Sequence, residues 1–230
     1  MKTETQESLG GSNMARRSFL RYAGVGAASV GLLATAACHK DHAITLNKGV
    51  DIGSGDIGIL NFAYALEQLE AAFYIQVIKT PYSGMSESEK SLLTSIRDHE
   101  VLHREFFKAA LAEKAIKALT PDFSSIDFTS RAKVLAAAKA FEDTGVSAYD
   151  GAGYLITNPV YLGLAGKIVS VEARHAALIR NLISPGDFAG DDVVASNGLN
   201  NSLSIKQVLP IANTYLKTKV SASNYGYIAS

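Results

Sequence analysis

The sequence has little cysteine, no excess of charge of either sign and no long hydrophobic run. A single cysteine among 230 residues excludes an internal disulfide framework. Twenty-two basic residues balance 22 acidic ones, which argues against a nucleic-acid-binding protein, because such a protein needs a strongly basic surface. No polybasic stretch of the kind that binds membranes is present either. Apolar residues make up 47% and charged residues 19%, so we expect a globular chain rather than a disordered one.

The N-terminus has the pattern of a targeting segment. Arg16 and Arg17 of "ARRSFLR" precede an uncharged run over residues 22–37. At about 16 residues, this run is shorter than the roughly 20 apolar residues of a membrane-spanning helix, which is the alternative interpretation. The pattern resembles a twin-arginine export signal, which a receptor reads as an address. We therefore expect residues 1–37 to be removed and the protein to be exported to the periplasm or cell envelope.

Two kinds of cleavage fit the end of this segment. The letters "ATA" before Ala37 suit an ordinary signal peptidase. The letters "TAAC" resemble a lipoprotein box that lacks the usual leucine, and they would place a lipid on Cys38. We favour the lipoprotein, which would be anchored to the membrane by that lipid.

The rest of the chain predicts helices, without strand-like alternation. After a linker over residues 38–55, capping residues and prolines delimit four helical stretches of about 25–30 residues. We expect these stretches at about 56–80, 86–120, 129–157 and 158–184. Because the connections look short, neighbouring helices should be antiparallel. The predicted fold is an all-α, antiparallel four-helix bundle over residues 56–184. The C-terminal extension, residues 185–230, should hold a loop and a short helix at about 204–219.

Each helical stretch carries an apolar stripe at a spacing of three to four residues, and ionisable residues interrupt every stripe. The interrupting residues are Glu67 and Glu70, Glu100 and His103, Glu142, and Glu172 and His175. Moving one carboxylate out of water costs several kcal/mol unless a cation pairs with it. The cost of burying four such carboxylates, one on each helical stretch, would exceed the roughly 5–15 kcal/mol that keeps a domain folded. Since the stripes offer no matching lysine or arginine, two divalent metal ions are the simplest source of balancing charge.

The pattern is also duplicated within the chain. "ALEQLEAAFY" (65–74) aligns with "AFEDTGVSAY" (140–149), and the Glu-x-x-His of residues 100–103 aligns with that of residues 172–175. Two helix pairs related by a pseudo-twofold axis would bring two half-sites together at the bundle centre. One glutamate from each of two helices and a Glu-x-x-His from each of the other two is the dinuclear carboxylate arrangement. The expected metal ligands are Glu67, Glu100, His103, Glu142, Glu172 and His175.

These motifs resemble the ferritin-like four-helix bundles, which include ferritins, bacterioferritins, rubrerythrins and manganese catalases. "LEQLEAAFY", "DHEVLH", "FEDTGVSAY" and "VEARHAALIR" are most similar to exported bacterial ferritin-like domain proteins related to plant desiccation-associated proteins. The resemblance covers about residues 56–184. In ferritins and bacterioferritins the ligand glutamate of the first helix precedes a tyrosine by seven residues, as Glu67 precedes Tyr74. This spacing favours Glu67 over Glu70 as the ligand on that helix.

Several residues near these motifs have more than one interpretation. Glu70 could be an additional or shifting ligand, or it could accept a hydrogen bond from a ligand histidine. Its counterpart in the repeat is Gly145, which would leave room opposite it. Tyr74 and Tyr149 are core aromatics whose hydroxyls need a partner, and a hydrogen bond to a ligand or a redox role is the sharper alternative. We assign no chemistry to His39, His42 and His99.

Mixed oxygen and imidazole ligation suits iron or manganese. We therefore expect two Fe ions, with two Mn ions as the alternative. The leading functional hypothesis is a di-iron oxidase or peroxidase that acts on Fe²⁺ with O₂ or H₂O₂ and protects against oxidative stress or excess metal. The alternatives are manganese catalase-like disproportionation of peroxide, and a non-enzymatic desiccation or stress protein whose metal is structural. We expect no nucleic-acid partner, and a homo-oligomer is compatible with the sequence.

Overall fold

The computed structural model describes residues 49–229. The expected export signal over residues 1–37, together with Cys38, His39 and His42, lies outside these residues and stays a prediction. Among the described residues, the helices are either too short or too polar to span a bilayer.

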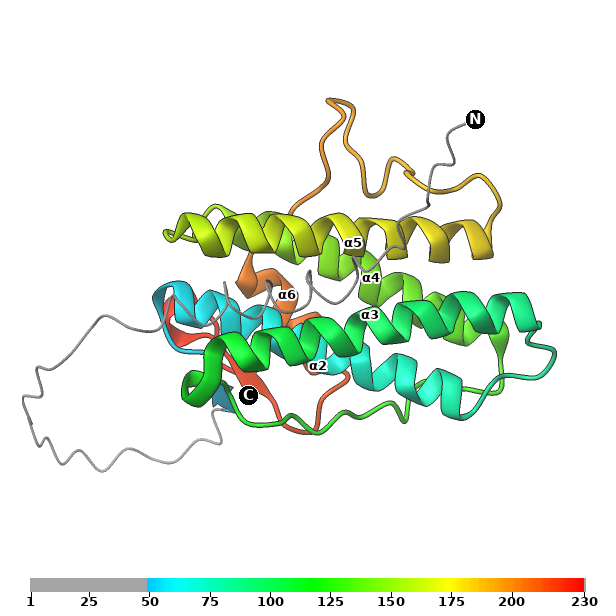
Figure 1. The fold of residues 1–230 in the computed structure, drawn as a ribbon, viewed down its shortest axis with the longest axis horizontal. Coiled ribbons are helices and arrows are strands. Elements are labelled where there is room, and N and C mark those ends of the chain that lie inside the picture. The colour runs from blue at the N-terminus through cyan, green and yellow to red at the C-terminus, as the bar shows by residue number, and fades with distance from the viewer. Residues whose placement is uncertain (1–48, 230) are drawn as a thin grey trace, which may run out of the picture. The chain divides into compact units, whose positions relative to one another are not determined.

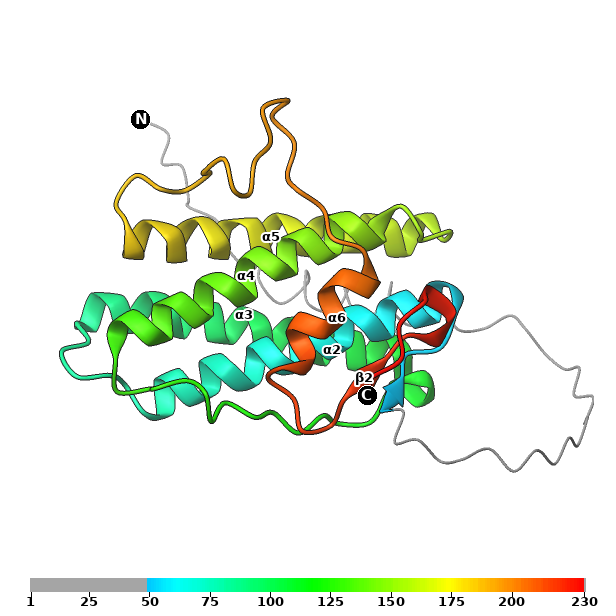
Figure 2. The ribbon, with the colours of Figure 1, turned by 180° about the vertical axis from the view of Figure 1, so that it is seen from behind.

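Four long helices form a bundle, which confirms the predicted all-α fold (Figure 1). They are α2 (Gly55–Lys79), α3 (Glu87–Leu111), α4 (Arg131–Gly153) and α5 (Pro159–Ile183). Side chains cap three of the four N-termini: Ser86 accepts from the backbone N–H of Glu89, Ser130 from that of Lys133 and Asn158 from that of Val160. Short turns join α2 to α3 and α4 to α5, and each of these pairs is antiparallel (Figures 1 and 2).

The connection between the two pairs differs from the prediction. Helix α3 ends at Leu111, well before Pro121, because Ala112 takes a left-handed φ of 48° and a single 3₁₀ turn, η1 (Ala112–Lys114), follows. The chain then runs back along the bundle over residues 115–130, so that α3 and α4 point the same way (Figures 1 and 2). The expectation of short connections with antiparallel neighbours throughout is wrong at this step.

The internal repeat explains this crossover. A twofold axis across the bundle exchanges its two ends. The second helix pair therefore begins at the end of the bundle opposite to the one at which the first pair finishes. A 25-residue helix is about 37 Å long, and the 16 residues of the crossover can reach about 53 Å when extended. Polar side chains of α2 hold it in place: Asn61 accepts from the backbone N–H of Ile116 at 2.9 Å, and Gln68 accepts from that of Leu119 at 2.8 Å.

The C-terminal extension packs against the bundle. Its helix α6 (Ile205–Asn213) lies against α2 and α4, and it is shorter than the predicted 204–219. It stops because the Asn213 side chain turns the chain back, donating to the backbone O of Val220 and accepting from its N–H. Two short strands that the sequence did not predict follow from this turn: β2 (Val220–Ser221) pairs in parallel with β1 (Val50–Asp51). A last 3₁₀ turn is η2 (Ser223–Tyr225). As a result, α2 is buried on nearly every side.

Candidate metal centre

The six predicted ligands come together in the middle of the bundle. Helices α2 and α4 each supply one glutamate, and α3 and α5 each supply a Glu-x-x-His pair. All four glutamates are fully buried, His175 is 4% exposed and the His103 side chain is 13% exposed. The burial follows from the apolar stripes, since the same spacing that turns Leu93 and Ile96 inward also turns Glu100 inward.

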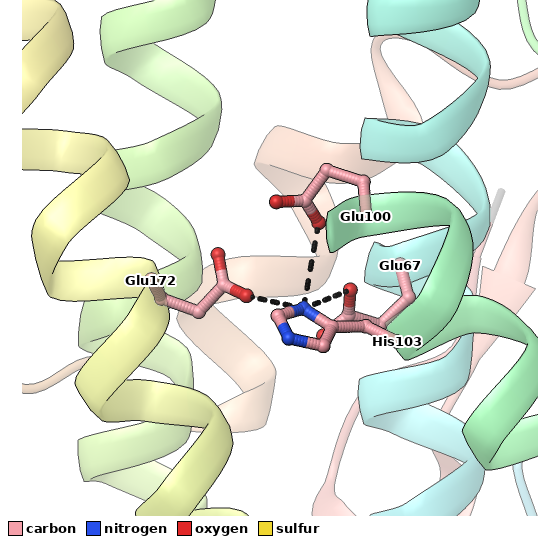
Figure 3. A group of neighbouring side chains, drawn as sticks. All are labelled: Glu67, Glu100, His103 and Glu172. Atoms are coloured by element: carbon pink, nitrogen blue, oxygen red, sulfur yellow. Dashed lines mark ion pairs between the residues drawn. The ribbon is translucent and has the colours of Figure 1, made fainter. Parts of the chain in front are cut away.

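The first half of the site surrounds His103 (Figure 3). Its Nδ1 atom lies 2.8 Å from Glu172 Oε1, 3.5 Å from Glu67 Oε2 and 3.9 Å from Glu100 Oε2. One donor atom from each of these four residues lies within 4.8 Å of the others, which is a spacing that could hold one metal ion.

The second half surrounds His175 in the same way. Its Nδ1 atom lies 2.8 Å from Glu100 Oε1 and 3.6 Å from both Glu142 Oε2 and Glu172 Oε2. These residues form a second group of possible donors within the same 4.8 Å limit. Glu100 and Glu172 belong to both groups, so these two carboxylates are placed where they could bridge two ions.

The two halves are related by the pseudo-twofold axis that the repeat predicts. Tyr74 donates a hydrogen bond of 2.5 Å to Glu142 Oε1, and Tyr149 donates one of 2.5 Å to Glu67 Oε1. Each tyrosine therefore orients a glutamate of the opposite helix pair. The closest histidine contacts are reciprocal as well, since His103 approaches Glu172 of α5 and His175 approaches Glu100 of α3.

The polar atoms at the centre lack hydrogen-bond partners, which makes the donor set fit a metal. Although several contacts are short, they do not have hydrogen-bond geometry. Eight buried oxygen and nitrogen atoms of the six residues are left without a hydrogen bond: Glu67 Oε2, both Oε atoms of Glu100, His103 Nδ1, Glu142 Oε2, both Oε atoms of Glu172 and His175 Nδ1. Buried groups of this kind are costly unless something pairs with them. Carboxylate and imidazole donors suit divalent transition metals.

Without metal, the site balances part of its charge with protons. Burial alone would lower the pKa of His175, but the carboxylates close to its Nδ1 atom, Glu100 first, raise it to about 12. The pKa of His103 is raised in the same way. Burial opposes ionisation of Glu172 too, yet the two histidines outweigh it and lower its pKa to about 2. Burial raises the pKa of Glu142 to about 7. Protonated histidines thus supply cationic charge that the sequence argument assigned to metal alone.

Glu70 lies beside the donor groups and belongs to neither of them. It is 4% exposed, and burial together with the neighbouring carboxylates raises its pKa well above the usual range. A Cβ atom on Gly145 would lie 3.0 Å from Glu70 Oε1, so the glycine provides the room that the sequence suggested. Glu70 is therefore a buried carboxyl group next to the centre, in surroundings that disfavour its ionised form.

His99 is the residue that the sequence argument missed. Its Nδ1 atom lies 2.9 Å from His175 Nε2, and the two ring planes are within 9° of each other. The contact joins α3 to α5, so the spacing along one helix carried no signal for it. His175 thus turns its Nδ1 atom toward the carboxylates and its Nε2 atom toward His99.

The comparisons with known proteins agree with this geometry. The search of curated proteins gave no match. A sequence model described as the ferritin-like domain matches residues 55–185, which is more than half of the chain and contains all four long helices up to Ile183. The chain therefore belongs to the ferritin-like domain family.

Proposed function

We propose that this protein binds two iron ions at the bundle centre and oxidises Fe²⁺ with O₂ or H₂O₂, as protection against oxidative stress or excess metal. The observation that carries the proposal is the duplicated group of buried carboxylate and imidazole donors that share Glu100 and Glu172. Two Fe²⁺ ions held side by side would supply the two electrons that peroxide takes up, together with two protons, to become two water molecules.

The chain's own residues would hold and orient the reacting groups. Glu67 and Glu142 would each bind one ion, and the hydroxyls of Tyr149 and Tyr74 fix the orientation of their carboxylates. Glu100 and Glu172 would bridge, and His103 and His175 would bind through Nδ1. Burial and the neighbouring carboxylates raise the pKa of Glu70, so this carboxyl group could supply a proton where the reduction of peroxide consumes protons.

The test is the rate of Fe²⁺ oxidation by purified protein in the presence of O₂ or H₂O₂. We expect oxidation well above the rate of free Fe²⁺, and its loss in the double variant Glu142→Ala/His175→Ala. Equal rates with and without protein would contradict the proposal. Evolution of O₂ from peroxide by manganese-loaded protein would instead support the catalase alternative. Metal that raises the melting temperature without any turnover would support the structural alternative.

We also propose that the protein works outside the cytoplasm. The support is the twin-arginine pattern of residues 16–17 and the uncharged run after it, with Cys38 as the site of a lipid. A homo-oligomer is a further proposal, supported by exposed apolar side chains at the start of α5, such as Val160 and Leu162. Fractionation of the native host would test the location, and light scattering would test the assembly.

A further inference from the structure

The two halves of the candidate centre differ in the support behind their histidines. The Nε2 atom of His175 lies 2.9 Å from His99 Nδ1. Within residues 49–229 no side chain forms a hydrogen bond with the Nε2 atom of His103. In the repeat, His99 aligns with Val171, because Glu100 aligns with Glu172. An aliphatic side chain cannot accept a hydrogen bond, so the pseudo-twofold symmetry is broken at this position.

The geometry fixes the roles of the nitrogen atoms. His175 Nδ1 faces the carboxylates, so the neutral ring that binds a metal through Nδ1 carries its proton on Nε2. That N–H would be donated to His99 Nδ1, which lies 2.9 Å from Nε2. The ring planes lie within 9° of each other and their centres are 5.1 Å apart, which suits two rings that meet edge to edge. His99 is exposed, so its own Nε2–H can face water.

We propose that His99 is a positioning residue that makes the two metal positions unequal, so that the position served by His175 binds its ion more tightly. The inference rests on the proposed dinuclear centre. A hydrogen-bond partner on the far nitrogen of a ligand histidine fixes its tautomer and orientation and makes it a stronger donor. Loss of such a partner typically weakens metal binding by about 10–100-fold. Among the side chains of residues 49–229, the Nε2 atom of His103 meets no such partner, so His103 gains no such advantage from them.

Zinc binding measured by calorimetry tests this inference without any redox step, because Zn²⁺ accepts the same donors and undergoes no redox change. The two positions are studied one at a time. His103→Ala keeps the position of His175, and His175→Ala keeps the position of His103. Each variant is compared with and without His99→Val, which copies the residue that the repeat places at position 171. Melting temperatures show whether every variant is folded.

We expect His99→Val to weaken zinc binding about 10–100-fold in the His103→Ala protein and to leave it unchanged in the His175→Ala protein. His99→Asn should restore much of the loss, because its amide oxygen can accept the same hydrogen bond. Equal effects of His99→Val in the two backgrounds, or no effect in either, would overturn the inference while the dinuclear centre stands. If the wild-type protein binds no metal, the proposed function fails as well.

Discussion

At the scale of single residues, the site depends on what surrounds each carboxylate. Tyr74 and Tyr149 hold Glu142 and Glu67 across the bundle. Glu70 has no second carboxylate opposite it, because its counterpart is Gly145, and it occupies the space that this glycine leaves open. The equivalence of Glu67 and Glu142 could be predicted from the repeat in the sequence. The contact between His99 and His175 could not, because it depends on how closely α3 and α5 approach each other.

The fit between Glu70 and Gly145 predicts an energetic coupling. Gly145→Ala would place a Cβ atom 3.0 Å from Glu70 Oε1, and overpacking of this kind costs about 1–3 kcal/mol. We expect the variant to be less destabilising in a Glu70→Ala background, as measured by denaturant unfolding in a double-mutant cycle. Gly166→Ala is the matched control, because an added Cβ there meets nothing within 4 Å. Strictly additive effects of the Gly145 and Glu70 changes would contradict the coupling.

Metal binding should release protons. Both histidines are protonated in the metal-free protein near neutral pH, since the pKa of His175 is raised to about 12 and that of His103 is raised as well. They must be neutral to bind metal, so loading both positions should release about two protons or more. Calorimetry in buffers of different ionisation enthalpy measures this number. Affinity should rise with pH through the neutral range, and a pH-independent affinity would contradict protonated histidines in the metal-free protein.

At the scale of elements, the bundle depends on segments that the hydrophobic pattern did not predict. The stripes predicted the four long helices, and capping residues marked the starts of α3 and α5, because helical periodicity and capping are local properties. The stripes did not predict that α3 ends at Leu111, because nothing in an alanine at position 112 indicates a left-handed φ. The crossover is set by the direction in which the two helix pairs must run, and that is a property of the whole fold.

The crossover should be sensitive to the polar side chains that hold it. Asn61 pairs with the backbone O of Ile52, the backbone O of Lys114 and the backbone N–H of Ile116, whereas Gln68 pairs with one backbone N–H. Each buried group left unpaired costs about 1–3 kcal/mol. We expect Gln68→Ala to lower the free energy of unfolding by about this amount, and Asn61→Ala to lower it by more, because three backbone groups lose their partner. Urea unfolding tests the order, and the reverse order would contradict it.

The loop after α5 is held by one buried cation. Arg180 is 1% exposed and pairs with Asp143 of α4 and with Asp187 and Asp192 of the loop. A hydrogen bond to a charged group contributes about 1.5–3 kcal/mol. Within this loop, the backbone N–H of Asn201 donates to the backbone O of Val193. We expect Arg180→Met to increase hydrogen exchange at this N–H by about tenfold or more. Lys139→Met is the control, because Lys139 contacts two of these aspartates, Asp143 and Asp192, from a more exposed position and should change little.

At the scale of the whole molecule, the chain is a helix-pair duplication closed around a polar centre. The duplication was visible in the sequence, and it sufficed to predict the bundle and to select six residues that the structure brings together. The covering of α2 by the crossover and by α6 was not visible, because neither segment shares the repeat. This covering buries α2, which carries Glu67 and Glu70, and burial of the glutamates is the reason to expect metal.

The most direct test of this account is metal analysis of the mature protein purified from its native compartment, beside the variant Glu142→Ala/His175→Ala. If the centre is dinuclear, we expect about two equivalents of iron or manganese per chain in the wild type and a clear loss in the variant. We also expect removal of the metal to lower the melting temperature. A native protein without metal, with undiminished stability, would contradict the dinuclear centre. The buried glutamates would then be held by the protonated histidines alone.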